Sequence, residues 1–305
     1  MKEFLNAIGL LPEYYKNILS AIPENIASQI KEIRFRNGGA VTLWGTSGLL
    51  YITTSGKPVF TAFDNILKTD EKQLQEIVFS LSRRSLHTYQ DMIAKGYIPL
   101  RGGCKAGVVG RAVMKNGSVY SVSSFNSINI RVAREFHGCS KDVLENMGEC
   151  RSFLIIGTPL SGKTTLLRDL CRHYSGKNSP QPLKSAVIDE RDEIASLSFG
   201  CGLDVGEHTD VLALYPKAIG TEIAVRTLSP DIIFLDEIGS EDEAKSLLSA
   251  VNTGVSIIAT AHGSGIDEVL KRPNIKCLVD SGVFKKAVIL EGRNEPCTVK
   301  EIVSF

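Results

Sequence analysis

Residues 157–164 read Gly-Thr-Pro-Leu-Ser-Gly-Lys-Thr, a complete G-x-x-x-x-G-K-[ST] phosphate-binding loop. The stretch before it, 152–156, is short, apolar and β-prone, and the stretch after it, 164–171, spaces its apolar residues as a helix does. Strand, tight loop and helix is the setting that this motif needs. A glycine-rich turn with a chance lysine would not bring both flanks with it. The sequence therefore predicts a nucleoside triphosphate site.

Each signature position of this loop has a chemical task. Gly157 and Gly162 allow backbone angles and close approaches that a side chain would forbid, so N–H groups and the helix N-terminus can surround phosphates. Lys163 would reach the β- and γ-phosphates, and the Thr164 hydroxyl would bind Mg²⁺. The residues expected to hold ATP are Gly157, Thr158, Pro159, Leu160, Ser161, Gly162, Lys163, Thr164 and Thr165.

Length and composition limit the class of protein. At 305 residues the chain fits about two domains of roughly 150 residues each. With 35 Lys and Arg against 34 Asp and Glu, it is not a protein that coats polyanions, although a local basic patch stays open. The seven cysteines are scattered without a C-x-x-C pair, which argues against a disulfide framework or a zinc site and favours reduced thiols in a cytosol.

The apolar stretches of the chain are short. The N-terminus lacks the pattern of a secretory signal, and no stretch approaches the ~20 apolar residues that span a bilayer. We therefore expect a cytoplasmic protein without direct membrane insertion, held at a membrane, if at all, by another protein.

The first part of the chain, residues 1–138, reads as an N-terminal α+β domain. Helical periodicity covers residues 1–30, short β-like segments follow, and an amphipathic helix is expected over Glu71–Arg83. A second β-rich stretch covers residues 97–134, with Asn116-Gly117 as a two-residue hairpin turn.

The second part, residues 139–305, alternates apolar strands with helical segments. Such alternation predicts an α/β fold with a mostly parallel sheet and helices on both faces. The expected strands are 152–156, 185–188, 231–235 and 255–260, the expected helices are 163–174, 240–251 and 264–270, and strand-like pieces at 285–290 and 297–304 end the chain.

The segment Asp231–Glu237 favours hydrolysis over phosphate transfer. Four apolar residues make a buried strand, and Asp236 follows at the end where open α/β sheets bind ligands. Asp236 is therefore expected to hold Mg²⁺ as a Walker B acid, and Glu237 to polarise a water against the γ-phosphate. The alternative is a pair of capping acids at the end of a strand.

Other polar residues follow predicted strands. Thr260 or His262 could sense the γ-phosphate, although a structural histidine at a strand end is the alternative. Glu190 lies in a cluster of four acids around Arg191, which is either a catalytic cluster or a solvated loop. Arg226 could pair with these acids or with phosphate.

An arginine from elsewhere often neutralises the charge of the transition state in such sites. Arg131 and Arg134, on the last strand before the second domain, are the candidates in the first domain. The sequence supports equally a catalytic role and a purely structural role for these two arginines.

The whole set of motifs resembles the stage III sporulation protein AA family, ATPases of endospore-forming bacteria that are similar to type II and type IV secretion ATPases. The resemblance covers nearly the full chain. It rests on Glu32–Arg36, Gly96–Pro99, Ala106–Arg111, Ser127–Val132, the loop at 157–164, Ile188–Arg191, Asp210–Leu212 and Arg226–Gly239.

The resemblance implies a RecA-like P-loop core, a hexameric ring, and ATP hydrolysis that energises a secretion or channel complex. Its partners would be membrane-embedded sporulation proteins between mother cell and forespore, with this chain on the mother-cell side. The acids around Arg191 would match the aspartate box of secretion ATPases, and His262 would lie near their histidine box. Two departures are Asp236-Glu237, where secretion ATPases usually have Gly-Glu, and the lack of room for their helical C-terminal domain. The alternative function is a RecA-like nucleic-acid motor or loader, since such cores serve both tasks.

Overall fold

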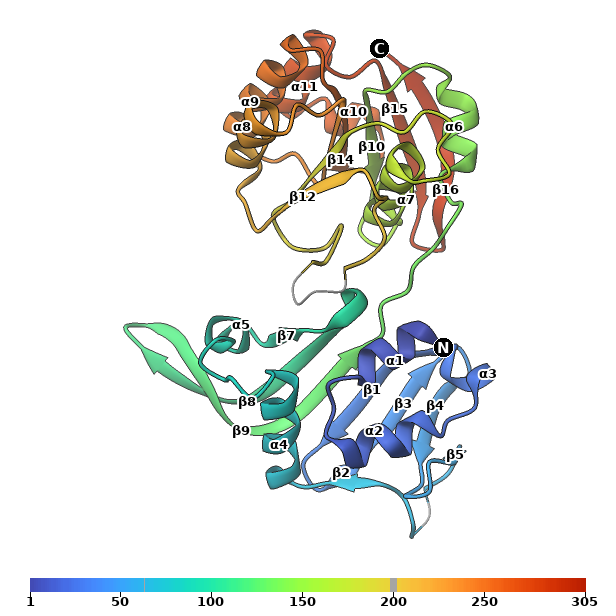
Figure 1. Cartoon of the computed structure of the whole chain (residues 1–305), viewed down its shortest axis with the longest axis vertical. Helices are drawn as coiled ribbons and strands as arrows, with labels where there is room; N and C mark the ends of the chain where they lie inside the picture. The colour runs from blue at the N-terminus through green and yellow to red at the C-terminus, as the bar shows by residue number, and fades with distance from the viewer. Residues whose placement is uncertain (63, 198–201) are drawn as a thin grey trace. The chain divides into compact units, whose positions relative to one another are not determined.

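The computed structural model describes residues 1–62, 64–197 and 202–305. The chain divides into two compact units (Figure 1). The first comprises Met1–Arg134, and the second comprises Glu135–Leu197 together with Leu203–Phe305. No helix in these described ranges has the length and apolar character to cross a bilayer.

The first unit is built on an antiparallel sheet with strand order β5-β4-β3-β1-β9-β8-β7. Its strands are β1 (Ile30–Arg36), β3 (Thr42–Gly45), β4 (Gly48–Ile52), β5 (Pro58–Val59), β7 (Tyr97–Pro99), β8 (Lys105–Lys115) and β9 (Ser118–Arg131). A second, two-stranded sheet pairs β2 (Gly39–Ala40) with β6 (Lys68–Thr69). The helices are α1 (Lys2–Ile8), α2 (Glu13–Ser20), α3 (Glu24–Ala27), α4 (Glu71–Leu81) and α5 (Gln90–Ala94), and Arg101–Gly103 forms a 3₁₀ turn.

Two local predictions for the first unit are confirmed. Helix α4 begins where expected because Asp70 and Gln73 form a capping box that satisfies the first N–H groups. Strands β8 and β9 meet at Asn116-Gly117, where both residues have positive φ, as a type I′ hairpin turn requires. The buried side chains of this unit form one hydrophobic core between the sheet and its helices.

The second unit has the predicted mostly parallel sheet, with strand order β12-β11-β13-β14-β10-β15-β16. Only β16 runs antiparallel to its neighbour. The strands are β10 (Phe153–Gly157), β11 (Ser185–Asp189), β12 (Thr209–Ala213), β13 (Ile232–Leu235), β14 (Ser256–His262), β15 (Lys286–Gly292) and β16 (Glu295–Ser304). The helices are α6 (Lys141–Met147), α7 (Lys163–Ser175), α8 (Lys217–Thr227), α9 (Glu241–Asn252), α10 (Ile266–Val269) and α11 (Pro273–Asp280).

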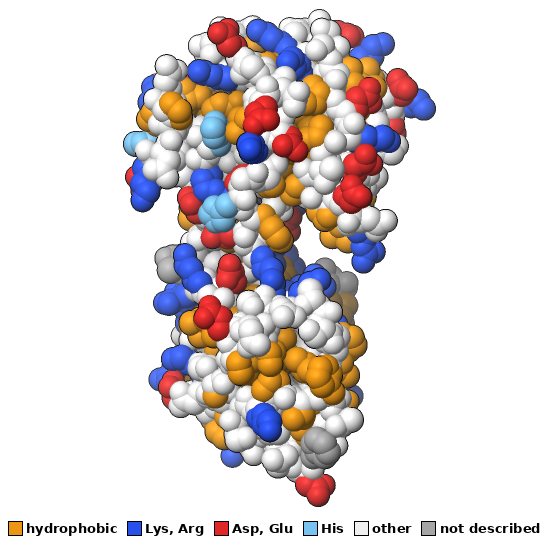
Figure 2. Space-filling view, turned by 90° about the vertical axis from the view of Figure 1, so that its right-hand side faces the viewer, with side chains coloured by type: hydrophobic (Ala, Val, Ile, Leu, Met, Phe, Trp, Pro, Cys, Tyr) orange, Lys and Arg blue, Asp and Glu red, His pale blue; other side chains and the backbone are white. Residues whose placement is uncertain are grey.

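The apolar runs of the central strands follow from burial on both faces of this sheet. Along β10, Phe153 and Ile155 join one buried cluster with α6 and α7, whereas Leu154 and Ile156 join another with α8, α9 and α11. Parallel strands covered on both sides lose the polar alternation of a half-exposed strand. On the face seen in Figure 2, acids and bases are interspersed over this unit.

Four elements that the structure describes in the second unit were not predicted: α6, β12, α8 and α11. Helix α8 carries Gly220 and several β-branched residues, which weaken the sequence signal for a helix. Tertiary packing explains the glycine, because a Cβ at Gly220 would lie 2.7 Å from Cγ2 of Ile188 in β11. The helix can pack this closely on the sheet only without a side chain there.

The boundary between the units lies before residue 138. The second unit begins at Glu135, and Phe136 and Gly138 are hydrogen-bonded to helix α7. The predicted boundary at 138–139 therefore falls within a segment that packs on the second unit.

Candidate functional site

The loop between β10 and α7 is shaped by its two glycines. Gly162 has φ +91° and ends the loop, and a Cβ there would lie 2.5 Å from Sγ of Cys297 in β16. A Cβ at Gly157 would lie 2.3 Å from the Ser161 hydroxyl. Both positions therefore require glycine, and the first N–H groups of α7 stay open toward the loop.

Lys163 and Thr164, the first residues of α7, meet the end of β13. The Lys163 ammonium donates to the carbonyl oxygens of Gly157 at 2.8 Å and Thr158 at 3.1 Å. Burial lowers the pKa of Lys163, and the charges of Asp236 and Glu237 oppose that shift. The Thr164 hydroxyl donates to Oδ2 of Asp236 at 2.8 Å. The hydroxyl and the carboxylate predicted to share Mg²⁺ are thus adjacent.

Thr260 binds Asp236, so the prediction that the Thr260 hydroxyl senses the γ-phosphate is corrected. Its side chain is fully buried, donates to Oδ1 of Asp236 and accepts from the backbone N–H of Glu237 at 2.9 Å. The hydroxyl is committed to these two partners. Thr260 therefore fixes the acid at the end of β13.

Glu237 sits beside the acidic segment that follows β11. Its Oε2 lies 3.6 Å from a terminal nitrogen of Arg191, and both side chains are solvent-accessible. Because an exposed ion pair at this distance is weak, the Glu237 carboxylate can rotate away from Arg191. Glu237 lies next to Asp236 and remains available to orient water.

Lys217, which was not predicted as a site residue, links the acids of this edge. At the start of α8, its nearly buried ammonium lies 3.5 Å from carboxylate oxygens of both Glu190 and Glu243. It also donates to the carbonyl oxygen of Glu237. Since α8 itself was not predicted, nothing in the sequence pointed to this lysine. The structure thus assigns Glu190 a cationic partner.

Asp189 is a structural member of the acidic cluster. Its carboxylate is buried and accepts backbone N–H bonds from residues 193–196 at 2.8 to 3.4 Å. A carboxylate that caps successive N–H groups shapes the loop. Glu190 and Arg191 are thereby held beside Asp236 and Glu237, and these residues share a small cavity.

His262 and Arg226 occupy different places relative to this site. His262 ends β14 in register with Gly157, so it lies beside the start of the loop, and its carbonyl oxygen accepts from Arg272 at 2.6 Å. Arg226 is exposed in the last turn of α8, roughly 14 Å along the helix axis from Lys217. The structure therefore does not bring Arg226 together with the acidic cluster that follows β11, because Arg226 lies at the other end of α8 from Lys217.

The two arginines of the first unit differ in exposure. Arg131 ends β9 with 75% of its side chain exposed, and its Nε lies 3.7 Å from Glu32. Arg134 donates to the carbonyl oxygen of Ile30 at 3.1 Å, and its Nε is buried. Arg134 is therefore built into the first unit, whereas Arg131 is accessible.

The loop fits a triphosphate with Mg²⁺. The Ser161 hydroxyl is buried without a hydrogen-bond partner in the part of the chain that the structure describes. The two glycines let the loop pack tightly on Ser161 and on β16, and an ammonium, a hydroxyl and a carboxylate converge on it. Such donors suit phosphate oxygens and a hard divalent cation.

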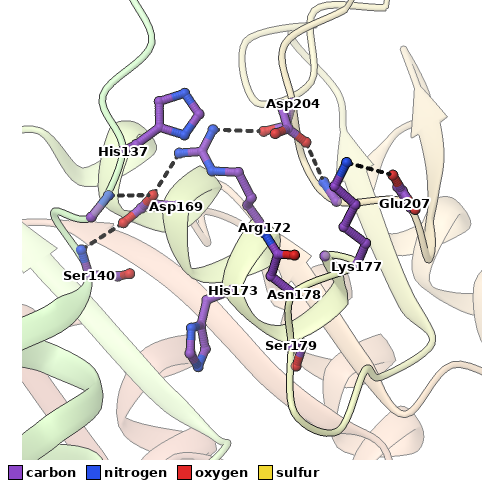
Figure 3. Close-up of a pocket in the computed structure, with 13 residues that line it drawn as sticks. His137, Ser140, Asp169, Arg172, His173, Lys177, Asn178, Ser179, Asp204 and Glu207 are labelled. Atoms are coloured by element: carbon purple, nitrogen blue, oxygen red, sulfur yellow. Dashed lines mark hydrogen bonds and ion pairs between the residues drawn. The ribbon is translucent and has the colours of Figure 1, made fainter.

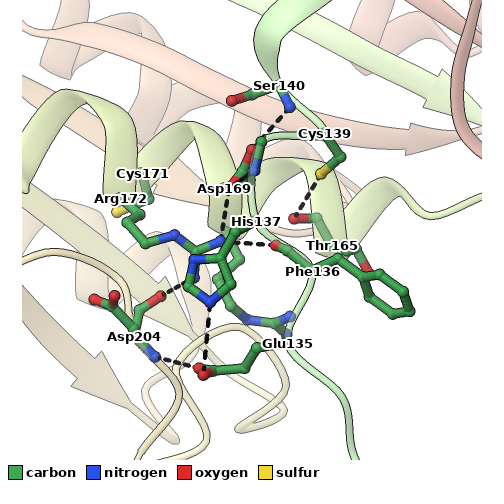
Figure 4. A network of polar contacts seen from close by, with 12 residues as sticks. Glu135, Phe136, His137, Cys139, Ser140, Thr165, Asp169, Cys171, Arg172 and Asp204 are labelled. Carbon is green, nitrogen blue, oxygen red and sulfur yellow. Dashed lines mark hydrogen bonds and ion pairs between the residues drawn. The ribbon is translucent and has the colours of Figure 1, made fainter.

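Helix α7 also anchors the segment Glu135–Ser140 (Figure 4). Asp169 accepts from the N–H groups of Gly138 at 3.1 Å and Ser140 at 2.8 Å, and Arg172 bonds both Asp169 and the carbonyl oxygen of Phe136. Burial opposes ionisation of Asp169, but the bonds from Arg172, Ser140 and Gly138 outweigh it and lower its pKa to about 2. The helix that starts at the loop is thus tied to the segment leading from the first unit.

A cavity of about 540 Å³ lies beside this anchor (Figure 3). Asp169, Arg172, Lys177, Asp204 and Glu207 contribute charges of both signs to its wall, and those charges are paired with one another or with backbone groups. The cavity is near the far end of α7 from Lys163, so it is separate from the phosphate-binding loop.

Solved structures with a similar fold include a pilus retraction motor and an ATPase. The pilus retraction motor PilT with bound ADP matches with a TM-score of 0.57 and 17% identity, over 85% of this chain and 74% of that one. The ATPase DotB of Legionella pneumophila matches with a TM-score of 0.54 and 14% identity, over 86% and 72%. At such identities the likeness concerns the fold alone.

Sequence relatives give a closer assignment. Over 297 residues the chain is 37% identical to the stage III sporulation protein AA of Bacillus subtilis (strain 168), covering 96% of this chain and 92% of that protein. The protein SEEDLING PLASTID DEVELOPMENT 1 of Arabidopsis thaliana is 30% identical over 157 residues, covering 50% of this chain and 22% of that protein. The model of the family described as Sporulation stage III, protein AA matches residues 9–304. The chain therefore belongs to the family Sporulation stage III, protein AA.

Proposed function

We propose that this protein is a Mg²⁺-dependent ATPase with a RecA-like core. It would work as a hexameric ring that energises a membrane-embedded secretion or channel complex during endospore formation, on the cytoplasmic, mother-cell side. Family membership supports the link to sporulation, and the fold shared with PilT and DotB supports a motor. The sporulation partners rest on the resemblance to this family.

The observation that carries the proposal is the contact between Thr164 and Asp236 at 2.8 Å, with Glu237 next in sequence. In this proposal Lys163 and the open N–H groups of α7 hold the phosphates, and Thr164 and Asp236 hold Mg²⁺. The cation would neutralise charge on the phosphate oxygens.

Glu237 is the proposed base. Its backbone N–H is fixed by Asp236 and Thr260, while its carboxylate is 42% exposed and can accept a hydrogen bond from water. Orienting a water for in-line attack on the γ-phosphate requires a carboxylate held at this edge. Glu190 is the alternative base, although Lys217 lies 3.5 Å from its carboxylate.

Glu237→Gln tests this assignment. The amide keeps the shape of the side chain but cannot accept a proton, so turnover should fall by ~10²–10⁴ while ATP affinity is kept. The measurement is steady-state phosphate release together with ATP binding by calorimetry.

Two further variants make the result specific. Glu241→Gln changes an exposed acid in the first turn of α9 and should leave turnover unchanged. Lys163→Ala should weaken ATP binding itself. Turnover at the wild-type rate by Glu237→Gln would reject Glu237 as the base, and unchanged ATP affinity in folded Lys163→Ala would reject the site.

A further inference from the structure

The β8–β9 hairpin extends beyond the part of the first unit that its helices cover (Figure 1). Near its base, Ala106 and Val108 are buried in the core, but every residue of β8 from Arg111 to Lys115 is exposed. Residues 118–120 of β9 are exposed as well. We call residues 111–122 the β8–β9 arm.

The end of the arm carries large apolar side chains. Met114 is 59% exposed, Tyr120 48%, Val119 41% and Val113 40%. Met114 is paired with Val119 and shares a face with it, whereas Val113, the residue before, points to the opposite face. A hairpin that only faces water would carry polar side chains there, so this concentration on both faces indicates a contact surface.

Charge identifies the kind of surface that the arm fits. The chain has no Asp or Glu between Asp91 and Glu135. That stretch contains seven cations: Lys95, Arg101, Lys105, Arg111, Lys115, Arg131 and Arg134. Two of these cations, Arg111 and Lys115, lie on the arm, which therefore carries positive charge and no acid in a chain whose formal net charge is only +1.

Cations and apolar groups are interleaved at the end of the arm. The Lys115 ammonium lies over the Tyr120 ring, 4.8 Å from its centroid, and Arg111 is exposed on the same hairpin. A tyrosine, aliphatic side chains and long cationic side chains together are typical of segments that rest in the interface of a membrane.

We propose that the β8–β9 arm docks on an anionic lipid surface. Met114, Val119 and Tyr120 enter the headgroup region, and Arg111 and Lys115 pair with lipid phosphates. No spanning helix is needed. A second copy of the arm would bring like charges together, and a nucleic-acid backbone would satisfy the cations but leave Val113 and Met114 without an apolar partner.

The test is co-sedimentation of the full chain with vesicles. Vesicles of phosphatidylcholine alone are compared with vesicles that also contain phosphatidylglycerol, at low and high salt. Because each Lys or Arg near such a surface contributes about five-fold in partitioning, we expect at least ~10-fold more binding to the anionic vesicles, lost at high salt.

Matched variants separate the arm from the rest of the surface. Lys115→Glu should lower binding about ten-fold, whereas Lys68→Glu, the same charge change on β6, should have a smaller effect. Met114→Ser with Val119→Ser should lower binding about ten-fold. Phe60→Ser, which removes a 72% exposed ring outside the arm, should not.

Insertion has its own readout. The only tryptophan is Trp44, so Tyr120→Trp in a Trp44→Phe background places a single reporter on the arm. Its emission should shift to the blue and be quenched by brominated lipids, while Trp44 of the wild-type chain should not respond. Circular dichroism verifies that each variant is folded.

Several outcomes would overturn the proposal. These are equal binding to neutral and anionic vesicles, binding unaffected by the arm variants, or a reporter that no lipid quenches. Arm variants that change the oligomeric mass but not vesicle binding would instead assign the arm to a second copy. Tighter binding of the arm to DNA than to vesicles would assign it to nucleic acid. None of these results depends on ATP turnover.

Discussion

Glu237 combines a strained backbone with the proposed catalytic role. Its φ is +35°, a conformation that costs a residue with a side chain about 1 kcal/mol or more. Three contacts hold it: its N–H bonds Asp236 and Thr260, and its carbonyl oxygen accepts from Lys217. A strained backbone conformation persists only where surrounding contacts hold it. In Glu237 these contacts also fix the backbone that carries the carboxylate that we propose as the base.

Lys217→Met should destabilise the second unit. The substitution keeps the apolar stem but leaves Glu190, Glu243 and the Glu237 carbonyl without their shared cation. We expect the free energy of unfolding to fall by about 1–2 kcal/mol, since Lys217 and its partner Glu243 are both largely shielded from water. Urea unfolding followed by circular dichroism measures this.

Lys245→Met is the control for Lys217. Lys245 pairs with Glu241 at 2.9 Å in an i,i+4 arrangement, and both side chains are mostly exposed. Such a pair contributes only ~0.5 kcal/mol or less. If both variants lost the same free energy of unfolding, the contacts of Lys217 would contribute no more than an exposed ion pair.

Helix α7 connects the phosphate-binding loop to the segment that leads from the first unit. Lys163 lies at its start, and Asp169 and Arg172 on its later turns bind Phe136, Gly138 and Ser140. A shift of this helix on ATP binding would therefore act directly on that segment. We therefore expect the whole helix, rather than any one residue, to transmit such a shift.

Asp169→Asn should make the free energy of unfolding depend less on pH in the acid range. The folded pKa of Asp169, about 2, lies below the unfolded value of 3.8, so its contribution is complete above pH ~4 and is lost as the pH falls toward 2. Over this pH range the free energy of unfolding of the wild-type chain should therefore fall by about 1–2 kcal/mol more than that of the variant. The variant has no carboxylate at this position and so has no such contribution to lose.

The measurement for Asp169 is urea unfolding at a series of pH values between 2 and 7. Asp142→Asn, which changes an exposed carboxylate in the first turn of α6, serves as the control and should leave the curve unchanged. An Asp169→Asn protein with the wild-type acid profile would contradict the proposed anchor.

At the scale of the molecule, neither of the two arginines that the sequence placed near the core site is a ready partner for the phosphates in the described structure. Arg226 lies at the far end of α8, and Arg191 is exposed with only a weak contact to Glu237. Arg131 of the first unit is 75% exposed and makes only a weak contact with Glu32 at 3.7 Å, so we predict that domain closure or a neighbouring subunit delivers it to the phosphates. We therefore expect hydrolysis to rise with oligomerisation.

Specific activity should accordingly increase with protein concentration across the range in which ultracentrifugation detects assembly. Arg131→Ala should lower turnover by up to ~10³-fold, the rate factor that an arginine finger contributes, with little effect on ATP affinity. Arg101→Ala, also exposed on the first unit, is the control. Constant activity per subunit, with Arg131→Ala unaffected, would mean that one core domain holds a complete site.

Much of the second unit could be predicted because its signals are local. The glycines and Lys163 specify the loop, and apolar runs mark β10, β11, β13 and β14 because a sheet covered on both faces needs them. Asp236 and Glu237 follow such a run directly, so their position at the ligand-binding edge also followed from the sequence. The hairpin turn at Asn116-Gly117 and the capping box of α4 are local in the same sense.

Only the tertiary structure decided which of the remaining polar residues meet. Thr260 is 24 residues from Asp236, and Lys217 is 20 residues from Glu237, so their contacts depend on strand order and on a helix whose glycine suits packing rather than propensity. Arg226 shows the reverse, because that same helix removes it from the site. The sequence by itself determined the chemistry of the loop and the end of β13. The packing of α8 and the order of the strands determined which cations and hydroxyls support that chemistry, since those partners are distant along the chain.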